Sequence, residues 1–424
     1  MPINDAMDVI EDGMVIVEKN TITAVGKREE LEAKYSLTAQ DEVIDAGNSI
    51  IMPGLINTHT HAAMAYFRGL ADDLPLDVWL GEHIWPAESK HLNPEFIKNA
   101  GELAVLEMIK SGTTCFNDMY LFEDTLGKVA EQAGIRALIG SVIFNFPCAS
   151  SASPNNTIAQ ALDQKEMFKA SELITIALNP HAIYTCSADV LKKVSQIAIE
   201  KNACVHIHLA ETKKEVDDCV KEHGKTPVEY LDELGLLSDR LIIAHAVWLS
   251  ENDLDLLAKH KVNVAHCPVS NKKLASGIAP IDKMLKKGIT VGLGTDGAAS
   301  NNTLDMFSDM RIAALLHKVS SMDPTVLSAR QAVRMATIEG AKVLGMDKKT
   351  GSLEPGKLAD IITINLDKPH LQPIYDPYSH LTYCVNGADV ENAVINGRVV
   401  MKNRKVKTLD EKKILDSAKS FKAE

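Results

Sequence analysis

Between residues 54 and 350, short apolar runs alternate with stretches whose apolar positions recur at helical spacing. Such an alternation predicts buried strands, each followed by a covering helix. Eight of these units in succession are typical of an α/β protein with a (β/α)₈ TIM barrel. A doubly wound open sheet is the alternative, but no Gly-x-Gly-x-x-Gly fingerprint follows a predicted strand. The strands are predicted over residues 55–58, 113–117, 136–142, 174–178, 205–208, 241–245, 263–266 and 290–294.

The N-terminal segment, residues 1–53, has the pattern of strands rather than of helices. Residues 12–26 predict two strands that flank a polar Glu18-Lys19-Asn20 turn. A short helix over residues 29–35 and a further strand over residues 42–45 are expected to follow. This segment is too small to bury a core alone, so it requires a partner elsewhere in the chain.

That partner is predicted at the other end of the chain, where a hairpin turn, Asn396-Gly397, separates two strand patterns. The pattern Thr408-Leu409-Asp410-Glu411 is a capping box that opens a final helix. We predict that residues 1–53 and 355–424 form one small, discontinuous β-sandwich beside a catalytic barrel of residues 54–354. The C-terminal strands are expected over residues 361–365, 390–395 and 398–401.

Composition excludes several classes of function. Hydrophobic residues make up 46% of the chain and charged residues 24%, as in soluble globular proteins. The net charge of -12 argues against a nucleic-acid partner, which requires clustered Lys and Arg. No signal peptide or bilayer-spanning run is present, and the seven cysteines form no Cys-x-x-Cys pair. We therefore expect a cytoplasmic protein, a homo-oligomer, that uses neither nucleic acid nor a membrane.

Polar side chains recur where the predicted barrel strands end. His59 and His61 close the first strand, and they project together because alternate residues of an extended chain point the same way. His208 ends the fifth strand, His245 ends the sixth, and Asp296 follows the eighth. The carboxyl ends of barrel strands meet at one face, which carries the active site. Three imidazoles and a carboxylate there predict a divalent metal site, with Zn²⁺ preferred and Fe²⁺ as the alternative.

These residues, framed by Pro53-Gly54 and by the stretch 355–360, resemble the amidohydrolase superfamily over nearly the whole chain. Within it, several stretches resemble the S-adenosylhomocysteine/5′-methylthioadenosine deaminases and the similar 5′-deoxyadenosine deaminases. The first and last of these stretches are shared with triazine hydrolases and other ring deaminases, so they identify the branch rather than the substrate. The stretches are residues 57–62, 77–80, 85–88, 206–212 and 294–302.

The resemblance implies a single metal ion. Some relatives hold two ions that are bridged by a carboxylated lysine at the end of strand four, but the stretch from Ile174 to His181 offers no lysine. The ligands that the resemblance implies are His59, His61, His208 and Asp296.

The resemblance also implies a reaction, the hydrolytic deamination of an adenine nucleoside at C6. Asp296 would take the proton of a water activated by the metal, and His245 would orient that water. Glu211 would give a proton to N1 of the ring, after which ammonia leaves. Both have structural alternatives, because Glu211 suits a helix N-terminus and His245 suits a core position or a fourth ligand.

Further residues are implied to hold the substrate. Glu88 would accept hydrogen bonds from both ribose hydroxyls, and His181 would hydrogen-bond to the purine. Trp79, with Phe67 and Trp85, would line the pocket. The alternative interpretations are that Glu88 is a surface glutamate, that His181 is a buried structural histidine, and that the three aromatic residues belong to the core. His266, at the end of strand seven, is expected to support the site together with its neighbours Ser270 and Asn271.

The segment after strand three departs from relatives that use S-adenosylhomocysteine. Those relatives hold the amino-acid carboxylate with arginines, whereas residues 139–157 contain neither Arg nor Lys. Phe144 and Phe146 instead favour a small 5′ substituent, so 5′-deoxyadenosine and 5′-methylthioadenosine are expected to be preferred over S-adenosylhomocysteine.

Rival functions share the same metal site. A guanine or cytosine deaminase, or a triazine-type aryl hydrolase, is the nearest, but a free base offers no pair of hydroxyls to Glu88. A catalytically inactive barrel scaffold is a rival of another class, and the joint presence of the four ligands, Glu211 and His245 argues against it. The cytidine-deaminase fold is excluded because its Pro-Cys-x-x-Cys element is absent.

Overall fold

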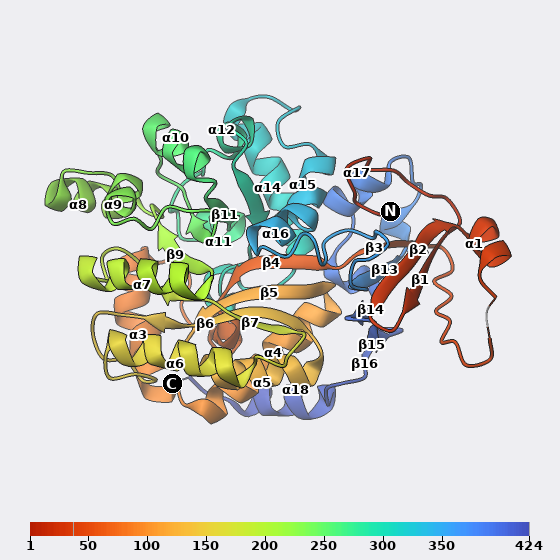
Figure 1. The fold of residues 1–424 in the computed structure, drawn as a ribbon, viewed down its shortest axis with the longest axis horizontal. Coiled ribbons are helices and arrows are strands. Elements are labelled where there is room, and N and C mark those ends of the chain that lie inside the picture. Colours follow the sequence, from red (N-terminus) through yellow and green to blue (C-terminus); the bar gives the residue numbers. More distant parts are fainter. Residues whose placement is uncertain (37, 424) are drawn as a thin grey trace.

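The computed structural model describes residues 1–36 and 38–423. Its larger part is a barrel of parallel strands surrounded by helices (Figure 1). The strands run in two hydrogen-bonded sets, and the predicted TIM barrel is confirmed. The first set is β4 (Leu55–Thr60), β5 (Thr113–Tyr120), β6 (Arg136–Ile143) and β7 (Ile174–Ile176), with β8 (Asn179–Pro180) also paired to β6; the second is β9 (Val205–Leu209), β10 (Leu241–His245), β11 (Asn263–His266) and β12 (Thr290–Leu293).

Two seams close the barrel. At one seam, Leu178 forms a parallel bridge to Val205, and its carbonyl accepts the His206 N–H at 3.0 Å. At the other seam, the Asp296 N–H donates to the His59 carbonyl at 2.9 Å, and the Thr58 hydroxyl donates to the Leu293 carbonyl. The second seam therefore brings two predicted metal ligands from opposite ends of the barrel sequence into direct contact.

Helices cover the outside of the barrel, and side-chain caps define where many of them begin. Ser250, for example, caps α10 with a capping box that pairs its backbone and side chain with Asp253. The covering helices are α4 (Pro94–Lys110), α5 (Glu123–Ala133), α6 (Pro154–Met167), α7 (Ala188–Lys201), α8 (Lys213–His223), α9 (Pro227–Glu233), α10 (Glu251–His260), α11 (Pro268–Lys273), α12 (Ile281–Lys286), α13 (Ala298–Asn301), α14 (Met306–Ser321), α15 (Ala329–Met335) and α16 (Ile338–Val343).

The connection from β4 to β5 is long and carries short helical segments. Its middle part is a π-helix, η2 (Trp79–Ile84), a rare form that occurs frequently at functional sites. The other segments are η1 (Ala62–Phe67), α2 (Leu76–Val78) and α3 (Trp85–His91).

Both ends of the chain contribute strands to one antiparallel sheet, which lies at one end of the molecule (Figure 1). Strand β3 (Ser49–Pro53) pairs with β13 (Ile361–Asn365), so that Met52 lies opposite Ile362. The predicted hairpins at both ends are confirmed. The remaining strands and helices of these segments are β1 (Gly13–Glu18), β2 (Thr21–Lys27), β14 (Val390–Ile395), β15 (Arg398–Lys402), β16 (Lys405–Val406), α1 (Arg28–Lys34), η3 (Pro369–Leu371), α17 (Pro377–Tyr383), η4 (Gly387–Asp389) and α18 (Glu411–Ser420).

Two local predictions for these segments are wrong. Residues 42–45 are not a strand: Val43 is exposed, and no described strand pairs with this stretch. Thr408 does not cap the last helix. Asp410 takes that position and accepts the Lys413 N–H, whereas the Thr408 hydroxyl donates to the Ala133 carbonyl at 2.7 Å.

A buried ion pair joins the barrel to the terminal sheet. Arg136, the first residue of β6, donates from Nε to Asp360 Oδ2 at 3.0 Å and from Nη2 to Oδ1 at 3.3 Å. Asp360 precedes β13 and also accepts the Thr350 hydroxyl and the Asn396 N–H. Both charged side chains are almost fully buried, so the ionised pair is stable only while both partners are in place.

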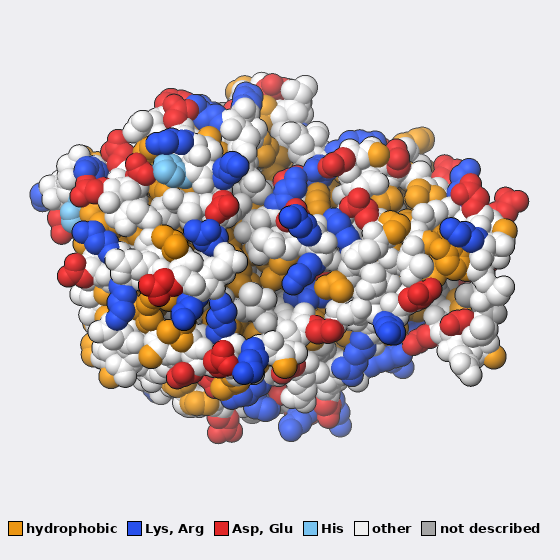
Figure 2. Space-filling model, in the orientation of Figure 1, with side chains coloured by type: hydrophobic (Ala, Val, Ile, Leu, Met, Phe, Trp, Pro, Cys, Tyr) orange, Lys and Arg blue, Asp and Glu red, His pale blue; other side chains and the backbone are white. Residues whose placement is uncertain are grey.

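Charged side chains of both signs are interspersed over the face shown in Figure 2.

None of the helices in the described residues has the length and apolar character that a bilayer span requires.

Candidate active site

The predicted ligand histidines are oriented by hydrogen bonds at Nδ1. His61 Nδ1 bonds to the Met119 carbonyl at 2.5 Å, and His208 Nδ1 bonds to the His181 carbonyl at 2.8 Å. His59 Nδ1 lies 3.0 Å from His206 Nε2. Metal-binding imidazoles almost always use one ring nitrogen in this way, so that the other faces the ion. The three Nε2 atoms are therefore available as donors.

These Nε2 atoms converge with the carboxylate of Asp296. Oδ1 of Asp296 lies 3.3 Å from His59 Nε2 and 3.2 Å from His61 Nε2. His61 Nε2 lies 3.3 Å from His208 Nε2. A tetrahedral zinc ion with bonds of about 2.0–2.1 Å separates its ligands by about 3.3 Å. These three separations fit the ion that the sequence predicts: His59, His61 and Asp296 form one compact group of donors, and His208 adjoins it at His61.

The environment of the histidines also fits a metal ion. His59 Nε2 is a buried nitrogen without a hydrogen-bond partner among the described residues, and such atoms require an explanation. Burial lowers the pKa of His59 to about 4 and holds that of His208 well below its usual range, so both imidazoles are neutral donors. Burial also acts to lower the pKa of His61, but Asp296 outweighs it and raises the pKa to about 9. A cation between His61 and Asp296 would replace that proton.

Asp296 is held as an ionised carboxylate with one oxygen facing the histidines. Burial acts to raise its pKa, but His59 and His61 outweigh burial and hold the pKa well below the usual range. Its second oxygen, Oδ2, accepts the Ser270 hydroxyl at 2.6 Å and the Ser300 hydroxyl at 2.8 Å. The two serines leave Oδ1 as the oxygen directed toward the donor cluster.

The backbone is strained where these residues leave their strands. His245 has φ 72° and Asp296 has φ 61°, and Ala210, which precedes Glu211, has φ 52°. Residues other than glycine seldom adopt this left-handed conformation, and when they do they cluster at active sites. Two of the strand-end residues that the sequence singled out, His245 and Asp296, therefore carry this strain, as does the residue before Glu211.

Glu211 and His245 lie together beside the donor cluster. His245 Nδ1 is 2.9 Å from Asn271 Oδ1, so its Nε2 faces inward, where it lies 3.8 Å from Glu211 Oε2. Burial raises the pKa of Glu211, and Oε1 accepts the Ser276 hydroxyl. His245 is also near enough to group with His59 and His208 as a possible donor. Glu211 is not a capping residue: Thr212 caps α8.

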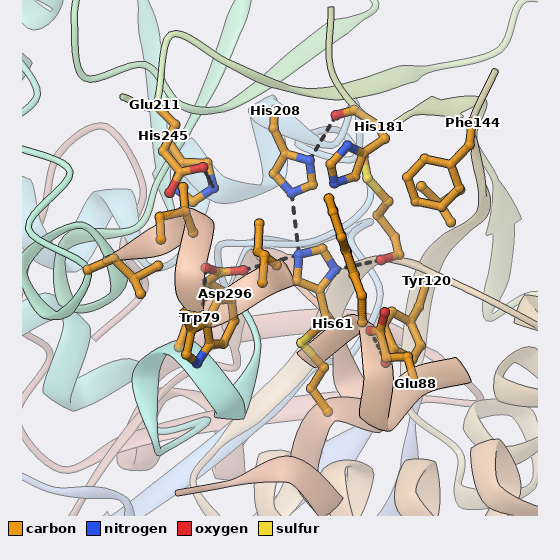
Figure 3. A pocket seen from close by; sticks show the side chains of 18 of the residues that line it. His61, Trp79, Glu88, Tyr120, Phe144, His181, His208, Glu211, His245 and Asp296 are labelled. Carbon is orange, nitrogen blue, oxygen red and sulfur yellow. Dashed lines mark hydrogen bonds and ion pairs between the residues drawn. The ribbon is translucent and has the colours of Figure 1, made fainter. Parts of the chain in front are cut away.

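Glu88 lies on the other side of His61 and is hydrogen-bonded to a tyrosine (Figure 3). The Tyr120 hydroxyl donates to Glu88 Oε1 at 2.5 Å. Burial raises the pKa of Glu88 to about 7, and this hydrogen bond counteracts part of that effect. Glu88 is thus a cavity carboxylate and not a surface residue.

One cavity connects these groups. His181 lines it, with Nδ1 bonded to the Thr185 hydroxyl at 2.9 Å. Trp79 also lines the cavity, and its indole N–H donates to the Ala71 carbonyl. The cavity is lined by His61, Met64, Leu76, Trp79, Leu80, Trp85, Glu88, Met119, Tyr120, Leu121, Val142, Phe144, His181, Tyr184, His208, Glu211, His245, Leu274, Asp296 and Ser300.

Two of the aromatic predictions need correction. Phe67 is fully buried in the core, where it stacks on Phe96, and is not among the described residues that line the cavity. Phe146 also lies outside the cavity wall: it is 48% exposed and stacks on Phe144, which does line the cavity.

Several residues of the site escaped the sequence analysis. His206 bonds to His59, and the Asn117 amide donates both to His206 Nδ1 and to the Thr58 carbonyl. Glu215 accepts the backbone N–H groups of Ala210 and Glu211 at 2.9 Å and so fixes the loop after β9. Among these residues, only His206 was indicated by the sequence, through its i, i+2 spacing from His208.

His266 was expected to support the site, but it pairs with His317 at 3.1 Å, and only its neighbours Ser270 and Asn271 contact the site.

Comparisons with known proteins identify the family. A model of the amidohydrolase family matches residues 50–400. The "5-methylthioadenosine/S-adenosylhomocysteine deaminase" of Thermodesulfovibrio yellowstonii is 47% identical over 418 residues, which cover 99% of this chain and 95% of the relative. The "5′-deoxyadenosine deaminase" of Methanothermobacter thermautotrophicus is 43% identical and covers 98% and 95%, respectively.

A solved structure is similar to this chain over nearly its full length. The crystal structure of an adenosine deaminase from Xanthomonas campestris with bound zinc is 39% identical, with a TM-score of 0.96 over 99% of this chain and 95% of that one. The family model spans most of the chain, and both relatives are similar over nearly their full length. The chain is thus a hydrolase and belongs to the amidohydrolase family.

Proposed function

We propose that this protein deaminates adenine nucleosides at C6, releasing ammonia and leaving the hypoxanthine nucleoside. The observation that carries the proposal is the order of groups along one cavity. Glu211 and His245 lie on one side of the donor cluster, and Glu88 lies on the other. A purine with an attached ribose presents a reacting ring and a pair of hydroxyls in the same order. The names of the two relatives support this substrate class.

In this proposal, His59, His61, His208 and Asp296 hold one divalent ion, most readily Zn²⁺. When bound, such an ion supplies Lewis-acid chemistry and makes water at the site more acidic. The stretch from Ile174 to His181 provides no lysine for a second ion.

The side chains then divide the proton transfers between them. Asp296 accepts the proton of the attacking water, and His245 Nε2 orients that water while Asn271 fixes the ring. Glu211, whose raised pKa favours the protonated form, donates to N1 and makes C6 more electrophilic. Water adds to C6, and the proton held by Asp296 passes to the exocyclic nitrogen. The bond from C6 to that nitrogen then breaks and ammonia leaves, while the hydroxyl on C6 returns its proton to Glu211 and becomes the carbonyl of the hypoxanthine.

Substrate binding falls to residues on the cavity wall. Glu88 accepts hydrogen bonds from the ribose hydroxyls. His181 uses the ring nitrogen that Thr185 leaves free to bond to the purine, and Trp79 packs its ring face against the substrate. This division assigns partners to N1, to a second position on the purine and to the ribose hydroxyls.

The substrate panel that tests this function also tests the 5′ group. Val142 and Phe144 line the cavity, and no Arg or Lys is present among its described lining residues. The nearest cations, Lys213, Lys214 and Lys273, line an adjoining hollow and are paired with aspartates. We therefore expect kcat/KM for 5′-deoxyadenosine and 5′-methylthioadenosine to exceed that for S-adenosylhomocysteine.

The measurement is ammonia release, together with the ultraviolet change from adenine to hypoxanthine, for these nucleosides and for free adenine, guanine and cytosine. A higher kcat/KM for S-adenosylhomocysteine would contradict the expected 5′ preference alone. Turnover confined to the free bases, or no turnover at all, would refute the proposed function.

The pH dependence of substrate binding should report on Glu88. Burial raises the pKa of this carboxyl to about 7, so it gains a proton as the pH falls through that value. A protonated carboxyl cannot accept from two hydroxyls at once with full strength. We therefore expect KM for adenosine to rise by about tenfold per pH unit below pH 7.

Steady-state kinetics between pH 5.5 and 8.5 measure this effect. The matched control is 2′,3′-dideoxyadenosine, which lacks both hydroxyls and whose KM should change little. A KM for adenosine that stays flat over the range would contradict the ribose role of Glu88.

A further inference from the structure

Tyr120 is the last residue of β5, and its side chain is buried at the cavity wall. Its hydroxyl donates to Glu88 Oε1, while its ring lies 6.1 Å from that of His61. Figure 3 shows Tyr120 and Glu88 side by side, away from Glu211 and His245. The tyrosine therefore contacts the carboxylate that recognises ribose in the proposed function, at a distance from the reacting end.

The end of β5 positions two parts of the site at once. The Asp118 carboxylate accepts the Ala62 N–H at 2.7 Å, and the Met119 carbonyl binds His61 Nδ1. Tyr120, the next residue, binds Glu88. Three consecutive residues thus fix the loop that carries a predicted metal ligand and the carboxylate on α3. The distance between the reacting centre and the ribose subsite is set by one rigid strand end.

A carboxylate oxygen has two lone-pair directions. When Tyr120 occupies one direction on Oε1, the remaining directions of Glu88 are turned toward the cavity, where a pair of neighbouring hydroxyls would meet them. Burial holds the pKa of Tyr120 well above its usual range, so its hydroxyl stays a donor through the range in which the enzyme would be assayed. The contact is also charge-assisted and short, which makes it stronger than a neutral hydrogen bond.

From this geometry we propose that Tyr120 is a positioning residue that orients Glu88 and so selects ribonucleosides over nucleosides that lack the 2′- and 3′-hydroxyls. The inference rests on the proposed nucleoside deamination. It adds a residue whose hydroxyl acts on selectivity through Glu88, without touching the reacting atoms.

The test is a double-mutant cycle with two substrates. The Tyr120→Phe variant should raise KM for adenosine by about tenfold or more, the effect of losing a hydrogen bond to a charged group. Its kcat for adenosine and its kcat/KM for 2′,3′-dideoxyadenosine should each stay within about twofold of wild type. In a Glu88→Gln background, Tyr120→Phe should add less than about twofold, because contacting residues that act through one interaction are not additive.

Tyr378→Phe is the matched control, because it removes the hydrogen bond that the hydroxyl of another buried tyrosine donates to the Met7 carbonyl. It should leave both substrates unchanged. Equal losses on adenosine and dideoxyadenosine in Tyr120→Phe, or additive effects with Glu88→Gln, would overturn the positioning role while leaving deamination intact. Failure of the wild-type protein to turn over any adenine nucleoside would overturn the proposed function and this inference together.

Discussion

The Glu211→Gln variant should lose deaminase activity by about 10²- to 10⁴-fold, the contribution typical of a positioned acid or base. Glutamine keeps the size of the side chain and its contact with Ser276, but it cannot pass a proton to N1 of the purine. The carboxyl of Glu211 is buried and lies 3.8 Å from His245, so bulk water cannot serve as the proton donor in its place. The measurement is kcat with the best nucleoside substrate, followed by ammonia release.

Metal content distinguishes this role from a structural one. Glu211→Gln should retain one ion per chain by elemental analysis, because its carboxylate is outside the proposed ligand set. Glu222→Gln makes the same chemical change on the exposed side of α8 and should behave like the wild-type protein. Loss of the ion from Glu211→Gln would mean that this residue binds metal, and unchanged kcat would remove it from the mechanism.

Removal of the metal should have an effect at least as large. Losing several kcal/mol of transition-state stabilisation corresponds to a fall of about 10³-fold or more in kcat/KM. Exhaustive chelation should produce this fall, and zinc should reverse it. His208→Ala should produce it irreversibly, because the donor 3.3 Å from His61 Nε2 is gone.

Thermal unfolding provides a readout independent of turnover. An ion at 100 times its dissociation constant stabilises the folded state by about 2.7 kcal/mol, so zinc should raise the Tm of chelated wild-type protein but not that of His208→Ala. His370→Ala, which alters a histidine paired with Asp389 in the terminal segment, should respond to zinc like wild type. Two ions per chain, or full activity after chelation, would contradict the single-metal site.

Much of the barrel could be predicted because most of its strands are buried on both faces and therefore read as apolar runs. The residues at which the strands end were harder to predict. β4 extends to Thr60 and β5 to Tyr120, beyond their predicted ends, since polar residues at these ends are buried by the site itself. The strand predicted over residues 42–45 was wrong for the opposite reason: the stretch has apolar residues but no described strand to pair with. Such pairing depends on distant residues, which local patterns do not contain.

The proposed metal ligands could be selected from the sequence because the fold places strand ends together, so their positions along the chain indicated that they would lie close to one another. Their supporting partners were not. His206, Asn117 and Tyr120 act through contacts between side chains of different strands, and no spacing rule specifies such a pair. Glu215 shows how a local rule misleads: Thr212-x-x-Glu215 has the capping-box pattern, yet the carboxylate binds the N–H groups of Ala210 and Glu211 instead.

The ion pair between Arg136 and Asp360 limits how the chain can be shortened. Trimming the protein to its barrel would remove both Asp360 and the sheet that buries Arg136 at the foot of β6. Even if Asp360 alone were replaced, Arg136 would stay buried without its counter-charge, and breaking a buried pair in this way costs about 3–5 kcal/mol, a large part of the stability of a typical protein. The small sheet is therefore needed for stability, and any shortened version of this enzyme has to keep both terminal segments.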